Sequence, residues 1–184
     1  MEDNTIRKYT VVIHSENQIG LLTQIANIFT RHSLNISSLA AGASPIEGIH
    51  TITIVTDATP KKILEVVQQI EKKVDVVRVF HYSDKDIVYR ELALYKVQTD
   101  KIMDSGNIEE LLQSHNAKII ELNKDFTVIS KVGTTDQTQE LYDHLNQFGV
   151  LQFQRSGRIV VSRERQEPLQ EYLKEREINR NNKF

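Results

Sequence analysis

The chain of 184 residues contains no cysteine, and neither sign of charge dominates it. Without cysteine it can form no disulfide, present no thiolate nucleophile and hold no zinc or iron through cysteine. Its formal net charge of −2 gives no basic field for nucleic acid and no polybasic patch for a membrane surface. No hydrophobic run approaches the length of a membrane span, and residues 1–4 lack the features of a signal peptide. We therefore predict a cytoplasmic protein that binds neither nucleic acid nor membranes.

Recognisable catalytic motifs are also missing. The sequence has neither a G-x-S-x-G nucleophile motif nor a G-x-x-x-x-G-K phosphate loop. Its histidines show no H-x-H or i, i+4 spacing, so a metal site would have to be assembled entirely by folding. They are His14, His32, His50, His81, His115 and His144. We predict no catalytic residue and no metal site in this chain.

The first half of the chain alternates strand and helix signals in the order β-α-β-β-α-β. Strands are predicted at residues 9–14, 35–39, 49–56 and 76–80, and helices from Leu21 and from Thr59-Pro60. This order is typical of the split βαβ, or ferredoxin-like, arrangement, in which two helices cover one face of a four-stranded antiparallel sheet.

The second half repeats the same order with little residue identity. Strands are predicted at 92–98, 117–122, 126–132 and 159–162, with one helix capped by Asn107 and Glu110 and another ending at Gly149. The sequence therefore predicts an α+β protein with two ferredoxin-like βαββαβ domains in tandem. Its parts are a first domain at 1–83, a linker at 84–88, a second domain at 89–163 and a charged C-terminal tail at 164–184.

The predicted strands carry apolar residues on both faces. Val76 and Phe80 alternate with Val77 and Val79, for example. Because the two helices of each domain cover only one face, the other face or a sheet edge needs a partner. We expect pairing with a second copy of the chain or with another domain.

The candidate functional site is the turn at residues 16–20, between the first strand and the first helix. Free backbone N–H groups at the start of that helix can receive a carboxylate. We expect this turn and the start of the next strand to lie in the same region, so that Asn17 and Asn35 can bind an amino acid. The predicted effector-binding residues are Asn17, Ile19, Gly20, Leu21, Leu22, Asn35 and Ile36. Taken singly, the glycine and the asparagines are equally typical of turns and caps.

Two rival functions use the same topology. An RNA-recognition domain needs aromatic residues on its central strands, but residues 49–55 contain neither Phe nor Tyr, so we reject RNA binding. A stand-alone enzyme on this scaffold is compatible with the fold, but no acid–base or nucleophile set supports it.

A series of motifs across residues 8–163 resembles the small regulatory subunit of acetolactate synthase (acetohydroxyacid synthase), whose N-terminal part is an ACT domain. In the first half these motifs are residues 17–22, Phe29, residues 35–39 and residues 74–79. In the second half they are residues 90–97, 117–120, Gly133-Thr134, Arg155-Ser156-Gly157 and Ser162-Arg163.

The resemblance implies that this chain performs no chemistry itself. It would bind the large catalytic subunit, which uses thiamine diphosphate, Mg²⁺ and FAD, raise its activity and confer feedback inhibition, typically by valine. The effector would lie between two ACT domains of a homodimer, with Asn17 and Gly20 from one protomer and Asn35 from the other. The alternative is a stand-alone ACT-type amino-acid sensor that acts on a different enzyme or regulator.

The sequence departs from the family pattern in two places. Where the family usually has an Arg-Gly pair after the first helix, this chain has His32 and Ser33. A left-handed residue other than glycine costs about 1 kcal/mol, so we expect the helix to end differently. Where a Ser-Arg pair commonly precedes the third strand, this chain has His50 and Thr51, so any role of that arginine cannot carry over.

Overall fold

The computed structural model describes residues 4–104, 106, 108–164 and 169–174. The chain divides into two units, one formed by residues 1–88 and 160–184 and the other by residues 89–159. None of the helices in the described parts of the chain is both long enough and apolar enough to cross a membrane.

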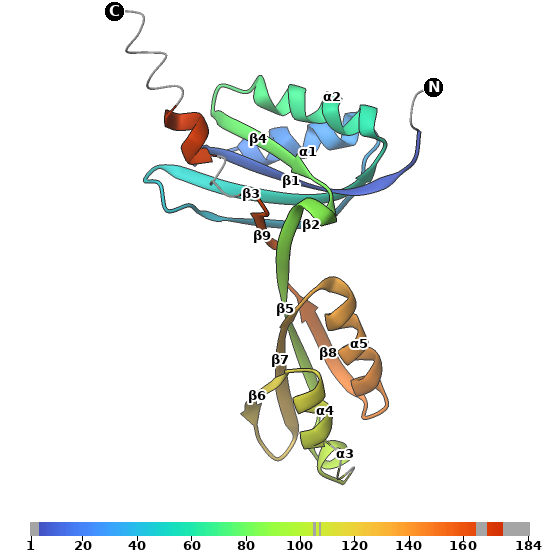
Figure 1. Cartoon of the computed structure of the whole chain (residues 1–184). Helices are drawn as coiled ribbons and strands as arrows, with labels where there is room; N and C mark the ends of the chain where they lie inside the picture. Colours follow the sequence, from blue (N-terminus) through green and yellow to red (C-terminus); the bar gives the residue numbers. More distant parts are fainter. Residues whose placement is uncertain (1–3, 105, 107, 165–168, 175–184) are drawn as a thin grey trace, which may run out of the picture. The chain divides into compact units, whose positions relative to one another are not determined.

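The first unit contains the predicted β-α-β-β-α-β order. Its elements are β1 Arg7–Glu16, α1 Leu21–Arg31, β2 Ile36–Ala43, β3 Ile49–Ala58, α2 Pro60–Glu71 and β4 Val76–Tyr82. The strands form an antiparallel sheet in the order β2-β3-β1-β4, and α1 and α2 lie together on one face of it (Figure 1). The ferredoxin-like prediction for this half is confirmed.

The core of the first unit lies between the two helices and the sheet. Its fully buried side chains come from helix positions three and four residues apart and from alternate strand positions, as the two periodicities require. They include Val11, Ile13, Ile25, Ile28, Phe29, Ile54, Ile63, Val66 and Ile70. Helix α2 begins as predicted, because the Thr59 side chain accepts a hydrogen bond from the Lys62 N–H and Pro60 occupies the first turn.

The opposite face of the first sheet is also partly buried. Val12 and Val55 are 7% and 3% exposed, and Phe80 is half-buried with its ring centroid 5.9 Å from that of His14. Residues 169–174, within the predicted tail, are helical, and Leu169 is 2% exposed. The guanidinium carbon of Arg78 lies 5.2 Å from the Tyr172 ring. Part of the stretch that we predicted as a charged tail therefore packs within this unit.

The second unit repeats the order with one additional helix. The elements from β5 onward are β5 Ile87–Gln98, α3 Thr99–Asp104, α4 Ile108–Ser114, β6 Lys118–Leu122, β7 Phe126–Gly133, α5 Thr135–Asn146 and β8 Val150–Arg155. Its sheet has the order β6-β7-β5-β8. Tandem ferredoxin-like units are thus confirmed. Asn107, the predicted cap of α4, lies outside the described residues.

The last strand of the second sheet was predicted in the wrong place. Residues 150–155 form β8, the fourth strand, whereas residues 159–162 form the short strand β9, which pairs with β5. The strand β8 has the sequence VLQFQR, in which glutamines flank Phe153 and weaken the apolar signal for a strand. The stretch 84–88 contains a single 3₁₀ turn, η1 Asp84–Asp86, followed by the start of β5.

Tyr95 is the largest fully buried side chain of the second unit's core. Its ring centroid lies 5.2 Å from that of Phe153, and its hydroxyl donates a hydrogen bond of 2.6 Å to the Thr138 carbonyl. Helix α5 begins with a capping box, in which the Thr134 hydroxyl accepts from the Gln137 N–H and the Gln137 amide oxygen accepts from the Thr134 N–H.

Candidate functional site

The predicted turn lies between the end of β1 and the start of α1. Gly20 is the N-cap of α1 with φ of +85°, a left-handed conformation that favours glycine. The N-cap makes no side-chain hydrogen bond to the helix, and the Leu21 N–H donates to the Gln18 carbonyl at 3.3 Å. Leu21 is buried in the core, whereas Leu22 is 42% exposed and Ile19 is fully exposed. The turn therefore presents backbone donors beside uncovered apolar side chains.

The second part of the predicted site is the start of β2. Asn35 is exposed, and its carbonyl accepts a hydrogen bond of 2.7 Å from the Thr56 hydroxyl. Ile36 is half-buried and packs against the core of the first unit. These contacts fix the backbone of Asn35, and its side chain is exposed at the start of β2.

The structure does not bring Asn17 and Asn35 together within one chain. Glu16, just before Asn17, is opposite Ile49 of β3, and Ile36, just after Asn35, is opposite Thr56. Seven residues of β3 separate those two levels, which corresponds to about 23 Å along the strand. Our expectation that both lie in one region of a single chain is therefore wrong. The reason is topological, because β1 and β2 run parallel and Asn17 ends one while Asn35 begins the other.

Two buried hydroxyl groups that we did not predict flank the two halves of the site. The Ser15 Oγ, just before the turn, and the Ser38 Oγ, just after Asn35, are buried without a hydrogen-bond partner among the described residues. An unsatisfied buried polar group costs about 1–3 kcal/mol. No sequence signal distinguishes these serines, since their isolation depends on tertiary packing.

The departure at His32 and Ser33 does not change how α1 ends. Ser33 adopts φ of +55°, its N–H donates to the Thr30 carbonyl, and the Leu34 N–H donates to the Phe29 carbonyl. This pair of bonds is the Schellman motif that a glycine normally completes. Our expectation of a different ending is wrong, because Ser33 accepts the left-handed conformation at a cost of about 1 kcal/mol.

The departure at His50 and Thr51 lies on β3. The Thr51 hydroxyl is 3.2 Å from the His14 Nδ1, and both side chains line a cavity of about 400 Å³ within the first unit. Much of the apolar lining comes from Val12, Pro45, Ile46, Phe80, Val161 and Leu169. None of the predicted effector-binding residues is among the described residues that line it.

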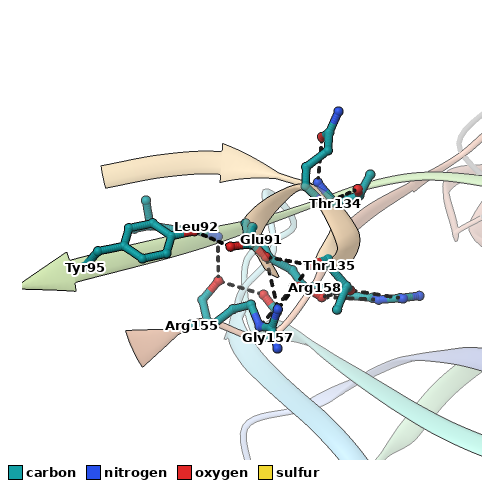
Figure 2. Close-up of polar contacts among 11 residues, drawn as sticks. Glu91, Leu92, Tyr95, Thr134, Thr135, Arg155, Gly157 and Arg158 are labelled. Carbon is teal, nitrogen blue, oxygen red and sulfur yellow. Dashed lines mark hydrogen bonds and ion pairs between the residues drawn. The ribbon is translucent and has the colours of Figure 1, made fainter. Parts of the chain in front are cut away.

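A cluster of charged groups in the second unit was also not predicted. The Glu91 carboxylate lies 3.6 Å from the Arg155 Nε and 3.5 Å from the Arg158 Nε, and it accepts a hydrogen bond of 2.7 Å from the Thr135 hydroxyl. Figure 2 shows Glu91, Thr135 and Arg158 pointing toward one another. The Arg158 guanidinium carbon is 3.8 Å from the centre of the Tyr89 ring.

Ser156 and Arg155, next to this cluster, form hydrogen bonds with backbone groups of neighbouring segments. The Ser156 hydroxyl accepts from the Leu92 N–H and donates to the Gly157 carbonyl, both at 2.9 Å. Arg155 also donates to the Thr135 carbonyl and the Thr138 hydroxyl. The motif Arg155-Ser156-Gly157 thus joins β8, β5 and the start of α5, and its polar groups serve the fold of the unit.

Comparison with known proteins gives two family matches in chain order. Residues 12–78 match the family described as AHAS small subunit-like ACT domain, and residues 90–164 match the family described as small subunit of acetolactate synthase. Together they span most of both units.

Individual relatives and a solved structure agree with these matches. The chain is 28% identical to a probable acetolactate synthase small subunit of Archaeoglobus fulgidus, over 85% of this chain and 97% of that protein. It is also 28% identical to the acetolactate synthase small subunit of Mycolicibacterium smegmatis, over 84% of this chain and 91% of that protein. The crystal structure of the acetolactate synthase small subunit from Thermotoga maritima superposes with a TM-score of 0.78 at 28% identity, covering 87% of this chain and 99% of that one.

Proposed function

Since the chain belongs to the family of acetolactate synthase small subunits, we propose that it activates the large catalytic subunit and makes that subunit sensitive to a branched-chain amino acid. The chain is a regulatory subunit, and catalysis lies in the large subunit. Valine is the first candidate effector. Thiamine diphosphate, Mg²⁺ and FAD belong, in this proposal, to the catalytic subunit, and the complex is cytoplasmic. Family membership over both units is the observation that carries this role.

We further propose that two copies of the chain pair through β2. This strand lies at one end of the sheet order, is eight residues long and contains no charged residue or proline, the usual protections of a sheet edge. Antiparallel pairing of two β2 strands about a twofold axis would place the Asn35 end of one copy beside the Asn17 end of the other. The separation of Asn17 and Asn35 within one chain supports a site shared by two chains.

In the shared site the effector's two charged groups have separate receptors. Its carboxylate would accept hydrogen bonds from the uncapped N–H groups at the start of α1, where the helix dipole favours an anion. Its ammonium would donate to the side-chain oxygen of Asn35 from the partner copy. Its apolar side chain would cover the exposed Ile19 and Leu22. The Ser15 and Ser38 hydroxyls, which are buried without a hydrogen-bond partner among the described residues, lie two residues before Asn17 and three residues after Asn35 in the sequence.

Inhibition requires that the effector bind the inhibited arrangement of the complex more tightly than the active one. Such a difference is typically about 1–3 kcal/mol. Linkage is reciprocal for binding, so if the effector changes the affinity of this chain for the catalytic subunit, the catalytic subunit changes the affinity for the effector by the same factor. One methylene in an apolar pocket changes the binding free energy by about 1–3 kcal/mol. Valine, leucine and isoleucine should therefore differ in affinity, and titration with each one measures the difference.

Reconstitution tests the proposal. Adding the chain to the thiamine-dependent catalytic subunit should raise acetolactate formation, and titrating the three amino acids should then lower it. The Asn17→Ala and Asn35→Ala variants should weaken inhibition more than activation. Asn27→Ala, an exposed position within α1 but away from its first turn, is the matched control and should leave both unchanged.

The outcomes separate the two functions that the sequence left open. Activation without any response to the three amino acids would exclude the proposed effectors. Binding of an amino acid without any effect on the catalytic subunit would favour the alternative, a stand-alone sensor that acts on a different enzyme or regulator. Full feedback sensitivity in both asparagine variants would exclude the proposed site.

A further inference from the structure

Two histidines that lie far apart in the sequence meet in the second unit. The Nε2 of His115 is 2.8 Å from the Nδ1 of His144, and the ring centroids are 4.9 Å apart with the planes inclined at 56°. His144 lies in the last turn of α5, and His115 follows α4. His144 is exposed and His115 is partly exposed, so both nitrogens are near solvent.

The separation of the two nitrogens equals the bite of a metal chelate. Imidazole nitrogens bind Zn²⁺ and similar divalent ions at about 2.0–2.1 Å, so two nitrogens at right angles around one ion lie about 2.9 Å apart, and about 3.4 Å apart in a tetrahedron. The observed 2.8 Å matches the right-angled case. Right-angled coordination by nitrogen and oxygen ligands is typical of Cu²⁺ and Ni²⁺.

The pair is held in place before any ion arrives. The His115 N–H donates to the Leu111 carbonyl at 3.2 Å, and the His115 carbonyl accepts from the Lys131 ammonium. His144 is flanked on its helix by Leu141 and Leu145, which are both fully buried. The backbone that carries each ring is therefore fixed, and an ion would require the two rings to turn so that both nitrogens face it.

Charged groups of both signs lie near the pair. Lys131 contributes one positive charge and Glu140 one negative charge. One ring must move its proton to its other nitrogen so that both facing nitrogens present a lone pair.

We propose that His115 and His144 form a two-imidazole chelate for a divalent transition metal, with Cu²⁺ and Ni²⁺ bound more tightly than Zn²⁺. Water would fill the remaining coordination positions, because the described residues contain no cluster of three His, Cys, Asp or Glu suited to a metal. The simpler alternative is an imidazole–imidazole hydrogen bond with no ligand. Histidine spacing could not reveal this pair, since 29 residues separate its members.

Calorimetric titration of the untagged full chain with NiCl₂ distinguishes the two explanations. The chelate predicts a binding step that His115→Gln and His144→Asn each weaken at least about tenfold, because even losing a group that only hydrogen-bonds a metal ligand costs about 10–100-fold. Gln and Asn place an amide near the lost ring nitrogen and preserve polarity. The control His50→Gln changes a partly exposed histidine of β3 and should leave that step intact.

A spectroscopic measurement keeps the test independent of folding defects. Cu²⁺ added to the wild-type chain should show an electron paramagnetic resonance signal with two nitrogen ligands, reduced to one or none in each variant. Equal nickel affinity in the wild type and both variants, or equal losses in His50→Gln, would overturn the proposal. A copper signal unchanged by both substitutions would overturn it as well.

Discussion

The Glu91 carboxylate lies 3.5 Å from the Arg158 Nε, and both side chains are almost completely excluded from solvent, at 5% and 3% exposed. Arg155 approaches the same carboxylate from β8, and Thr135 donates to it from the start of α5. One carboxylate therefore compensates charge on two arginines from two different segments. Such a centre makes the packing of β5, β8 and α5 depend on a single residue.

Glu91→Gln should destabilise the second unit by about 3–5 kcal/mol, because it removes the buried carboxylate that pairs with Arg158 and Arg155. The free energy of unfolding from urea titration measures this. The matched control is Glu71→Gln, which breaks the 3.0 Å ion pair with the more exposed Arg78 and should cost less than about 1 kcal/mol. Similar losses in the two variants would show that the buried cluster is not a special centre of stability.

The Tyr95 hydroxyl should ionise at a higher pH than the hydroxyl of a solvent-exposed tyrosine. Burial raises the pKa of its hydroxyl to about 12, against about 10 in an unfolded chain. Because the folded pKa is the higher one, the stabilising contribution is complete below pH 10 and is lost as the pH rises through about 12. Ultraviolet titration of phenolate should show a late step that Tyr95→Phe removes. That variant should also lose about 1 kcal/mol with the hydrogen bond to Thr138. Superimposable titrations of the two proteins would contradict this assignment.

Ser33→Gly should stabilise the first unit by up to about 1 kcal/mol. Glycine relieves the left-handed strain at the end of α1, and part of that gain is offset by its greater freedom in the unfolded chain. Thermal or urea unfolding measures the change. Ser37→Gly, in the extended strand β2, lacks the strain and should instead destabilise by about 0.5–1 kcal/mol. A destabilising effect at both positions would argue against strain at Ser33.

Mixed dimers test whether the effector site is shared. A dimer of one Asn17→Ala chain and one Asn35→Ala chain contains one site with both changes and one site with neither. Mixing the two variants should therefore restore part of the feedback inhibition that each lacks alone. The measurement is inhibition of the reconstituted enzyme by valine, with each variant alone as the control. No recovery after verified subunit exchange would indicate that both asparagines act within the same chain.

The sequence was sufficient for most of the fold because its periodic signals are strong. The apolar stripe of α1, the Thr59-Pro60 start of α2 and the alternating Ile and Thr of β3 each predict one element, and each forms. The same reasoning failed at β8, where alternation between Phe153 and glutamines was too polar to indicate a strand. It also treated Leu169 as part of a tail, because burial by a distant sheet leaves no local signal.

For the site, the sequence proposes a set of residues, and the structure shows where two of its parts lie within one chain. Gly20 has the positive φ that its turn position suggested, and the first turn of α1 is uncapped. Asn17 and Asn35 lie at opposite ends of the sheet because β1 and β2 run parallel. Only the register of β3 with its two neighbours reveals this placement. The pairs Glu91–Arg158 and His115–His144 join residues 67 and 29 positions apart, so no local pattern could predict them.

The opposite placement of Asn17 and Asn35 has a consequence for how sensitivity depends on abundance. If two chains must associate to complete each effector site, dilution separates the dimers and removes effector sites. The apparent affinity for the effector is therefore lower at lower protein concentration. A cell could then adjust its metabolic set point through the expression level of this chain alone. Half-saturating effector concentrations measured over a hundredfold range of protein should follow the dimerisation curve.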